Sequence, residues 1–468
     1  MFRDQSRSVV QKAVRSRAPK AIPANISPPI NDQARDFFFS QYVFGKTGAF
    51  DYIQSFSLEN DQHLGDSITA VSLAHFSTKA NSVDVMTKAR IKYISALRLL
   101  NRALQTPELV TKDATLLAIL LLDLFEKITK APPYSEEFST NHIHGALELV
   151  KLRGDDQFND PVGLRMFFQL CSTILISCVQ FDIAIPVDFK ALRRKAENHI
   201  NPTEPKSRLT EVIIRFIEFR VALKNHTLIG SDAVFMAKLL DEDFLSISET
   251  MPLDFKYYTV PTHSELSISY QDFFHVYPCH RVTHMWNLLR ILRILLNEFI
   301  WKQCLEALEL HPTHYLKQMH NAQIERCSRA IGLLAAEICA AVPQYTSLPQ
   351  LPKKSFSEYV PGCLGGDHCQ GRYSAYHSPT RQYYAGSSDL RPPFQSVPCY
   401  SLLFPLYVAG QSLGCPEPMR DWIIKRLHSI SSDIGIKEAF LVAKALESRD
   451  NISLWSMYAL IGCYSFSA

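Results

Sequence analysis

ARIKYISALRLLNRAL, residues 89–104, is the stretch from which the fold class of this chain is best predicted. Its apolar residues recur every three or four positions with basic residues between them, which places one apolar stripe on a helix. The stripe comprises Ile91, Ile94, Leu97, Leu100 and Leu104. Similar periodicity occurs at 110–129, 139–153, 161–182, 208–226, 280–310, 317–342, 417–430 and 435–447. Because strand-like alternation is scarce, we predict an all-α fold.

Composition and proline content predict the organisation of the chain. With 468 residues it is long for one core, and 47% hydrophobic with 20% charged residues predicts a folded, soluble protein. Prolines break the helical pattern at 18–33 and at 346–398. The predicted parts are a basic segment with a Pro-rich linker (1–33), a large multi-helix domain (34–345), a flexible Pro/Gly-rich insertion (346–398) and C-terminal helices that pack on the same domain (399–468).

Net charge, apolar stretches and cysteine positions limit the classes of partner and the cellular compartment that the sequence predicts. The net charge of +3 is too small to indicate a nucleic acid or a membrane as partner of the whole chain. The apolar stretches 114–125 and 164–181 are interrupted by polar residues and predict buried helices rather than membrane spans. Cysteines inside apolar segments, such as Cys171, Cys178 and Cys339, predict core residues in a reducing compartment.

The first twenty residues are strongly basic, with Asp4 as their only acidic residue. Such a segment fits a nuclear-import patch, a weak and salt-sensitive contact to phosphates, or a solvated tail, and its composition also resembles a mitochondrial presequence. The basic side chains are Arg3, Arg7, Lys12, Arg15, Arg17 and Lys20.

RGDDQFND (153–160) raises the question of a magnesium site, because paired aspartates hold Mg²⁺ against a diphosphate in isoprenoid enzymes. Arg153 and Gly154 indicate that the preceding helix stops here. Asp155 and Asp156 then fall in a turn, without a second acidic cluster of matching spacing. Asp160 before a proline is better interpreted as the N-cap of the next helix.

Three other patterns resemble chemical sites. GQSLG (410–414) matches the nucleophile elbow of a serine hydrolase around Ser412, but Pro416 follows at once and no parallel sheet is predicted. His280 and His284 would share a helix face, although two ligands do not close a zinc site. Further candidate metal ligands have irregular or unsuitable spacing: Cys363, His368, Cys369, His377, and the pair His142 and His144. We therefore predict no catalytic residue, no metal site and no cofactor.

Several segments together resemble the helical regulatory region of fungal binuclear zinc-cluster (Zn2Cys6) transcription factors. They occur in the order of that family and span about 400 residues. They are MFRDQSRSVVQKA (1–13), YISALRLLNRAL (93–104), ATLLAILLLDLFEKIT (114–129), HIHGALELVKLRG (142–154), MWNLLRILRILLNEFI (285–300), EICAAVPQY (337–345) and FPLYVAG (404–410).

The resemblance implies a nuclear, non-enzymatic regulator of transcription, for example of secondary metabolism. Its helical body would contact coactivators or repressors or bind a small-molecule effector. The family's zinc cluster, six cysteines with CxxC pairs, is missing from this sequence, whose first cysteine is Cys171. We therefore expect no sequence-specific DNA contact by this chain alone.

Two alternatives stay open. One is a serine hydrolase or another enzyme of a fungal biosynthetic pathway, and the other is a dominant-negative partner that pairs with a homologous full-length factor.

A small-molecule effector would need a cavity. We place it between the helices at 85–129 and 280–342, where Leu and Ile are dense, unless these residues simply form the core.

Overall fold

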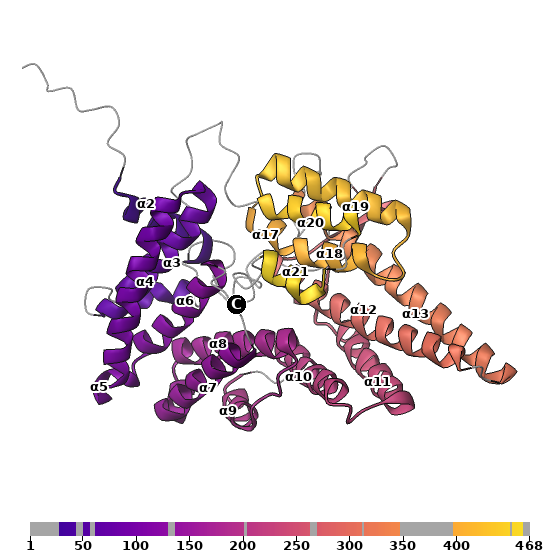
Figure 1. Cartoon of the computed structure of the whole chain (residues 1–468), viewed down its shortest axis with the longest axis horizontal. Helices are drawn as coiled ribbons and strands as arrows, with labels where there is room; N and C mark the ends of the chain where they lie inside the picture. The colour runs from indigo at the N-terminus through magenta and orange to yellow at the C-terminus, as the bar shows by residue number, and fades with distance from the viewer. Residues whose placement is uncertain are drawn as a thin grey trace, which may run out of the picture.

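The computed structural model describes residues 28–43, 50–56, 61–129, 136–200, 204–262, 269–310, 313–346, 396–449 and 452–461. The described chain is predominantly helical (Figure 1). Its strands, β1 (Tyr258–Pro261) and β2 (Phe273–Val276), form one antiparallel hairpin in which Tyr258 pairs with Val276. The predicted all-α fold is confirmed.

The first half of the chain packs around one hydrophobic cluster, the N-terminal core, which is formed by buried residues from Ala34 to Ile217. Short π- and 3₁₀-helical turns, η1 (Phe39–Val43), η2 (Asp51–Ser55) and η3 (Asp155–Phe158), connect its helices. The α-helices are α2 (Ile30–Phe38), α3 (Gln62–Ala80), α4 (Val83–Leu104), α5 (Pro107–Val110), α6 (Asp113–Thr129), α7 (Glu136–Arg153), α8 (Pro161–Phe181) and α9 (Val187–Glu197).

The second half packs around the C-terminal core, formed by buried residues from Leu209 to Ile461. Its helices are α11 (Gly230–Glu249), α12 (His280–Glu309), α13 (His314–Ala340), α14 (Pro343–Thr346), α17 (Ser396–Ser401), α18 (Leu403–Gln411), α19 (Glu417–Ser429), α20 (Lys437–Ser448) and α21 (Leu454–Ile461), with the turns η4 (Leu253–Phe255) and η8 (Ile430–Ile434). Helices α17–α21 therefore share a core with α11–α13.

Helix α10 (Pro205–Lys224) belongs to both cores. Leu209, Val212 and Phe216 recur at three- and four-residue spacing on one face and join the C-terminal core. Ile214 and Ile217 lie on another face and join the N-terminal core. A helix with two apolar faces is buried on both, and α10 thus connects the two halves.

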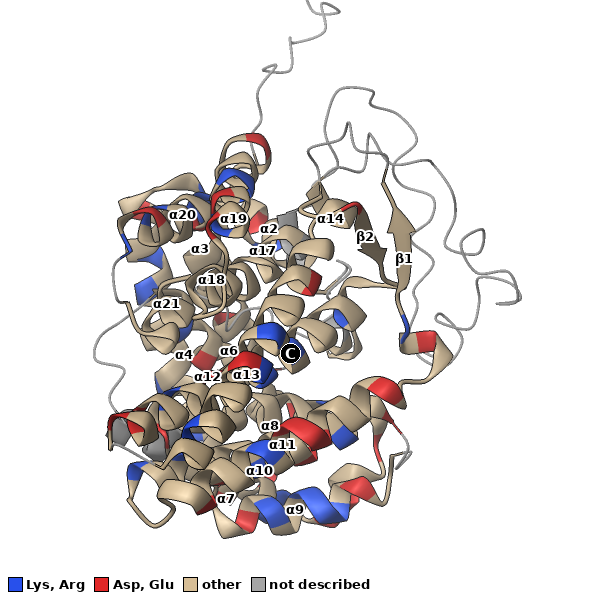
Figure 2. Cartoon of the chain, turned by 90° about the vertical axis from the view of Figure 1, so that its right-hand side faces the viewer, with Lys and Arg blue, Asp and Glu red and all other residues tan. Residues whose placement is uncertain are grey.

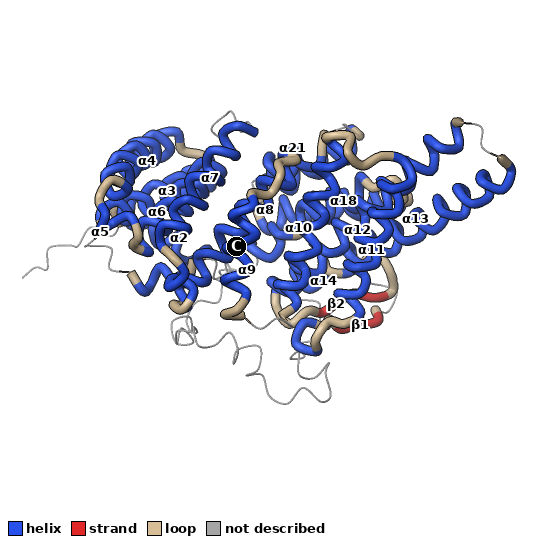
Figure 3. The backbone as a smooth tube through the Cα atoms, turned by 90° about the horizontal axis from the view of Figure 1, so that it is seen from below, coloured by secondary structure: helices blue, strands red, loops and turns tan. Residues whose placement is uncertain are grey.

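The structure favours the second interpretation of the Leu- and Ile-rich segments 85–129 and 280–342, that their apolar residues form the core, over an effector cavity between them. Buried residues of α4 and α6 belong to the N-terminal core and to a small satellite cluster, whereas those of α12 and α13 belong to the C-terminal core. Figures 1 and 3 show the two helix pairs on opposite sides of the molecule. The leucines and isoleucines of these segments instead fill separate cores or, on part of α4, lie exposed.

Two details refine the predicted organisation. Helix α2 begins at Ile30, so the end of the range predicted as linker is already helical. Helix α8 is long and apolar enough to cross a membrane, but Phe167, Leu170 and Ile174 are buried in the N-terminal core. Most of the predicted insertion, residues 347–395, lies outside the described residues.

Candidate functional site

The aspartates of RGDDQFND lie at a helix junction. Gly154 has φ +74°, a conformation that favours glycine, and ends α7. The Asp160 carboxylate accepts a hydrogen bond of 2.7 Å from the Gly163 backbone N–H, as a helix N-cap does. The predicted cap is confirmed. Asp155 is exposed and pairs with Lys195 at 2.9 Å, so this carboxylate is engaged on the surface.

Ser412 lacks the surroundings of a hydrolase nucleophile. The residues before it form helix α18, whereas a nucleophile elbow follows a strand. The side chain is 3% exposed, and its hydroxyl donates to the Ala409 carbonyl at 2.8 Å. The segment that leads into Ser412, α18, is thus a buried helix and not a strand.

The histidine and cysteine candidates do not assemble a metal site within the described residues. His280 and His284 do lie on one helix, α12. Burial lowers the pKa of His284 to about 4, with the Lys206 charge adding to the shift. Cys363, His368, Cys369 and His377 lie outside the described residues, as does the side chain of His142. The predicted core cysteines Cys171, Cys178 and Cys339 are buried, as expected.

The basic segment predicted to contact phosphates or import factors, Arg3 to Lys20, lies outside the described residues. In the described part, the side drawn in Figure 2 carries both charge signs interspersed along α9, α10 and α11. A nucleic-acid surface is normally a patch or stripe of one sign, and these three helices do not form one.

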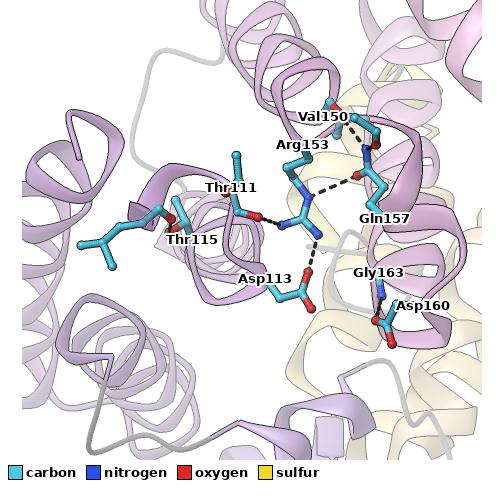
Figure 4. A network of polar contacts seen from close by, with 10 residues as sticks. Thr111, Asp113, Thr115, Val150, Arg153, Gln157, Asp160 and Gly163 are labelled. Carbon is cyan, nitrogen blue, oxygen red and sulfur yellow. Dashed lines mark hydrogen bonds and ion pairs between the residues drawn. The ribbon is translucent and has the colours of Figure 1, made fainter. Parts of the chain in front are cut away.

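A polar network joins three helix ends in the N-terminal half (Figure 4). Arg153, the last residue of α7, donates to the Thr111 carbonyl at 2.8 Å and to Gln157 at 3.2 Å, and it pairs with Asp113 at the start of α6. Cations at helix C-termini and anions at N-termini are favourable because of the helix dipole. The Gln157 amide donates in turn to the Val150 carbonyl at 2.8 Å. Arg153 therefore connects α7, η3 and α6.

The C-terminal half contains a second arginine network, around Arg290. Its guanidinium is 0% exposed and donates from Nε to Glu337 at 2.9 Å and from Nη1 to the Tyr277 hydroxyl at 2.7 Å and to Asn287 at 3.1 Å. Asn287 precedes Arg290 by three residues on α12, so both side chains share a helix face. Glu337 comes from α13 and is partly exposed.

Aromatic rings surround the same guanidinium. The Arg290 Cζ lies 5.2 Å from the ring centre of Tyr257, 5.8 Å from Tyr277 and 5.4 Å from Trp286, within cation–π range. Tyr257 directly precedes β1 and Tyr277 directly follows β2, so hairpin pairing brings these rings together. The long-range hairpin thus completes the aromatic enclosure of an arginine on α12.

Burial and the charge of Arg290 shift the pKa values of the titratable groups around it. Burial raises the pKa of Tyr277, while the nearby Arg290 charge opposes the shift. Burial and the Arg290 charge lower the pKa of His275 to about 3, so this imidazole is neutral. The Arg290 Nη2 is buried and has no hydrogen-bond partner among the described residues. The cluster therefore offers a fixed positive charge with an unpaired N–H donor group, Nη2, which suits an acceptor oxygen.

The Arg290 network was not predicted from the sequence. Its members, Tyr257, Tyr277, Arg290 and Glu337, are up to 80 residues apart and follow no local pattern. The available signal was Arg290 itself, because MWNLLRILRILL (285–296) places it four residues after Trp286 within a strongly apolar helix. A charged residue at such a register is buried only with partners.

Comparison with known families finds a similarity in one part of the N-terminal half. Residues 50–178 match the family model described as the fungal specific transcription factor domain. No curated protein matches the chain, and no solved structure does. The match runs from Phe50 to Cys178 within α8, so it lies in the half built around the N-terminal core. The predicted resemblance to the regulatory region of transcription factors is confirmed for these residues, which are similar to a domain described for fungal transcription factors.

Proposed function

We propose that this protein is a nuclear transcriptional regulator of the fungal zinc-cluster type, which acts through protein contacts of its helical body. The supporting observation is the match of residues 50–178 to a fungal transcription factor domain. The all-α architecture fits this proposal, because helical faces receive partner helices readily. Specific DNA reading is assigned to a zinc cluster or a partner factor, and the helical body supplies regulation.

Tethering tests this function directly. The whole chain is fused to a heterologous DNA-binding domain, and a reporter with the matching site is measured in fungal cells. We expect expression to change at least several-fold relative to the DNA-binding domain alone, in either direction. Unchanged expression, with the fusion present at equal abundance, would contradict the proposal.

Nuclear import by the basic segment has its own test. A fluorescent fusion of the chain is compared with a variant in which Arg3, Arg7, Lys12, Arg15, Arg17 and Lys20 are replaced by Gln. We expect nuclear fluorescence for the natural sequence and a shift toward the cytoplasm for the variant. Replacing Lys79, Lys88, Arg194, Lys195, Lys425 and Lys437 by Gln gives a control with the same charge change. Mitochondrial fluorescence would favour the presequence interpretation instead.

The hydrolase alternative is tested with a fluorophosphonate probe on the purified chain. We expect no labelling, because the Ser412 hydroxyl is buried and donates to a backbone carbonyl. Labelling that disappears in Ser412→Ala would support the enzyme.

The pairing alternative is tested by light scattering of the chain mixed with a full-length zinc-cluster factor.

A further inference from the structure

Helix α4 packs into the molecule through its small residues. Its buried positions are Val85, Ala89, Ala96, Leu100 and Ala103, separated by four, seven, four and three residues. This side faces α3 and α6, which are its main packing neighbours. Helices approach more closely where the side chains between them are small. The face that α4 buries is therefore mostly alanine.

Several of the larger apolar residues of α4 point outward, whereas Val85 and Leu100 are buried. Ile91 is 62% exposed, Ile94 48% and Leu104 38%, although all three belong to the stripe read from the sequence. Ile91 and Ile94 lie about 60° apart around the helix axis, since each residue turns by about 100°. Single exposed apolar residues are common on proteins, but these continue a face that already includes Val83, which is 80% exposed. The stripe is thus largely a surface feature.

Positive charge borders this face. Arg98 lies between Ile91 and Ile94 in angle, and Arg90 and Arg102 lie at the sides of the face. Among the described residues, none of these three arginines forms an ion pair, whereas Lys92 on the flank pairs with Asp66 of α3 at 2.8 Å. Asp84 is the only acidic residue of α4. The exposed face thus combines branched apolar side chains with unneutralised arginines.

A protein partner fits this face better than a membrane surface does. Helices that lie in a membrane interface usually insert aromatic or leucine side chains from a wide apolar face. The aromatic residue of α4, Tyr93, instead stacks on Phe125 of α6 with ring centres 4.3 Å apart. The face left outside is narrow and lies on a helix already packed against α3 and α6.

We propose that the exposed face of α4 docks an acidic amphipathic helix of a transcriptional partner. Ile91 and Ile94 contact the apolar side of that helix, and Arg90, Arg98 and Arg102 pair with its carboxylates. The partner class rests on the proposed function, while the charge and apolar pattern come from α4 itself. Such helix-on-helix recognition uses anchors at three- and four-residue spacing, which matches the spacing of Ile91 and Ile94.

The probe is a fluorescein-labelled synthetic peptide of leucine, alanine and glutamate, with its leucines on one helical face. Its binding to the purified full chain is measured by fluorescence anisotropy. We expect Ile91→Asp combined with Ile94→Asp to weaken binding at least tenfold, and Arg98→Glu to weaken it several-fold. The Arg98→Glu effect should shrink at high salt, because salt screens exposed charges.

Three controls separate docking from non-specific binding and from misfolding. Leu310→Asp changes a residue that is 82% exposed at the end of α12, and it should leave peptide binding unchanged. Circular dichroism melts should be equal for all variants, since the substituted side chains are exposed. A scrambled peptide of the same composition should bind at least tenfold more weakly than the amphipathic one.

Several results would overturn the docking proposal. The scrambled peptide could bind as tightly as the amphipathic one, or the Ile91/Ile94 variant could bind the peptide as tightly as the natural sequence does. The chain could also bind anionic vesicles but not the peptide, or form a homodimer that Ile94→Asp dissociates. The tethered reporter distinguishes this failure from failure of the proposed function. A reporter response that survives the Ile91/Ile94 change leaves the function intact and removes the role of α4.

Discussion

The two halves of the molecule each contain a buried arginine, and the two arginines are held in different ways. Arg153 in the N-terminal half bonds to a backbone carbonyl and to residues at helix ends. Arg290 in the C-terminal half bonds to side chains from α12, α13 and the end of β2, inside aromatic rings. Among the partners of Arg153, Thr111 is exposed, Asp113 is 35% exposed and Gln157 is buried. Among those of Arg290, Glu337 is 37% exposed, whereas Tyr277 and Asn287 are both buried.

This difference predicts unequal costs of removal. When a buried charge loses its partner, the groups left behind have no water to replace it. Groups at a helix end near the surface regain hydration instead. We therefore expect the C-terminal half to depend more on Arg290 than the N-terminal half depends on Arg153.

The largest expected effect is that of Arg290→Met, which deprives Tyr277, Asn287 and Glu337 of a shared donor. We expect the free energy of unfolding of the C-terminal half to fall by about 3–5 kcal/mol. Three tryptophans, Trp286, Trp301 and Trp422, pack against the C-terminal core alone, and the fourth, Trp455, packs against both cores. Urea unfolding followed by tryptophan fluorescence therefore reports mainly the C-terminal half, and circular dichroism reports both halves.

A matched pair of variants sharpens the test. Glu337→Gln keeps a hydrogen-bond acceptor at the partly exposed end of the network, and we expect it to cost less than half as much as Arg290→Met. If Arg290→Met shifted the fluorescence and dichroism transitions equally, the two halves would unfold as one unit, and the comparison between them would fail.

The next effect concerns pH and His275, which is buried beside Arg290. Its folded pKa of about 3 lies below the ordinary 6.5, so the unfolded state binds the proton first as pH falls. The stability from neutral His275 is complete above pH 6.5 and is lost progressively toward pH 3, reaching about 3 kcal/mol at pH 4. His275→Gln should flatten the fall of the tryptophan-monitored urea midpoint between pH 6.5 and 4.5.

The exposed His314 provides the control for this pH dependence, because His314→Gln should leave the slope unchanged. The His275→Gln variant should keep part of the pH dependence of the urea midpoint, because burial also lowers the pKa of His284, in the same half, to about 4. If His275→Gln and the natural sequence showed the same pH dependence of the urea midpoint, His275 would take up its proton equally readily in the folded and unfolded states, which contradicts the prediction.

Arg153→Ala is expected to cost about 2 kcal/mol, through lost charge-assisted hydrogen bonds to Asp113, Thr111 and Gln157. The loss should appear in circular dichroism and leave the tryptophan transition in place. Lys151→Ala is the control on the same helix, because water and salt screen its exposed pairs with Glu148 and Asp188, which should contribute little to stability. Equal losses for the two variants would contradict a special role of Arg153.

Local signals predicted much of the N-terminal half. The end of α7 at Gly154 and the cap at Asp160 each depend on residues a few positions apart, so the sequence carries them directly. The spacing in 89–104 also predicted helix α4 correctly. It did not predict which face is buried, because that depends on the small side chains of α4 and on the neighbouring helices. Periodicity shows that a stripe exists, and packing decides where it points.

Long-range signals were absent for the C-terminal half. The Arg290 network requires β1 and β2 to pair across a connection of eleven residues, and α13 to pack along α12. Neither contact follows from composition or from helical period. The same limit applies to the effector cavity, since density of Leu and Ile in two segments does not show that the segments meet.

The smallest expected effect tests the helix-end side of the comparison. Asp160→Ala removes the acceptor for the Gly163 N–H and should cost about 1 kcal/mol, as loss of an N-cap usually does. Asp160→Asn keeps an acceptor and should recover most of that loss. Asp156→Ala, at an exposed neighbour, should change nothing measurable by circular dichroism. If Asp156→Ala cost as much as Asp160→Ala, the carboxylates would act together, and binding of Mg²⁺ by calorimetry would then decide whether they hold a metal.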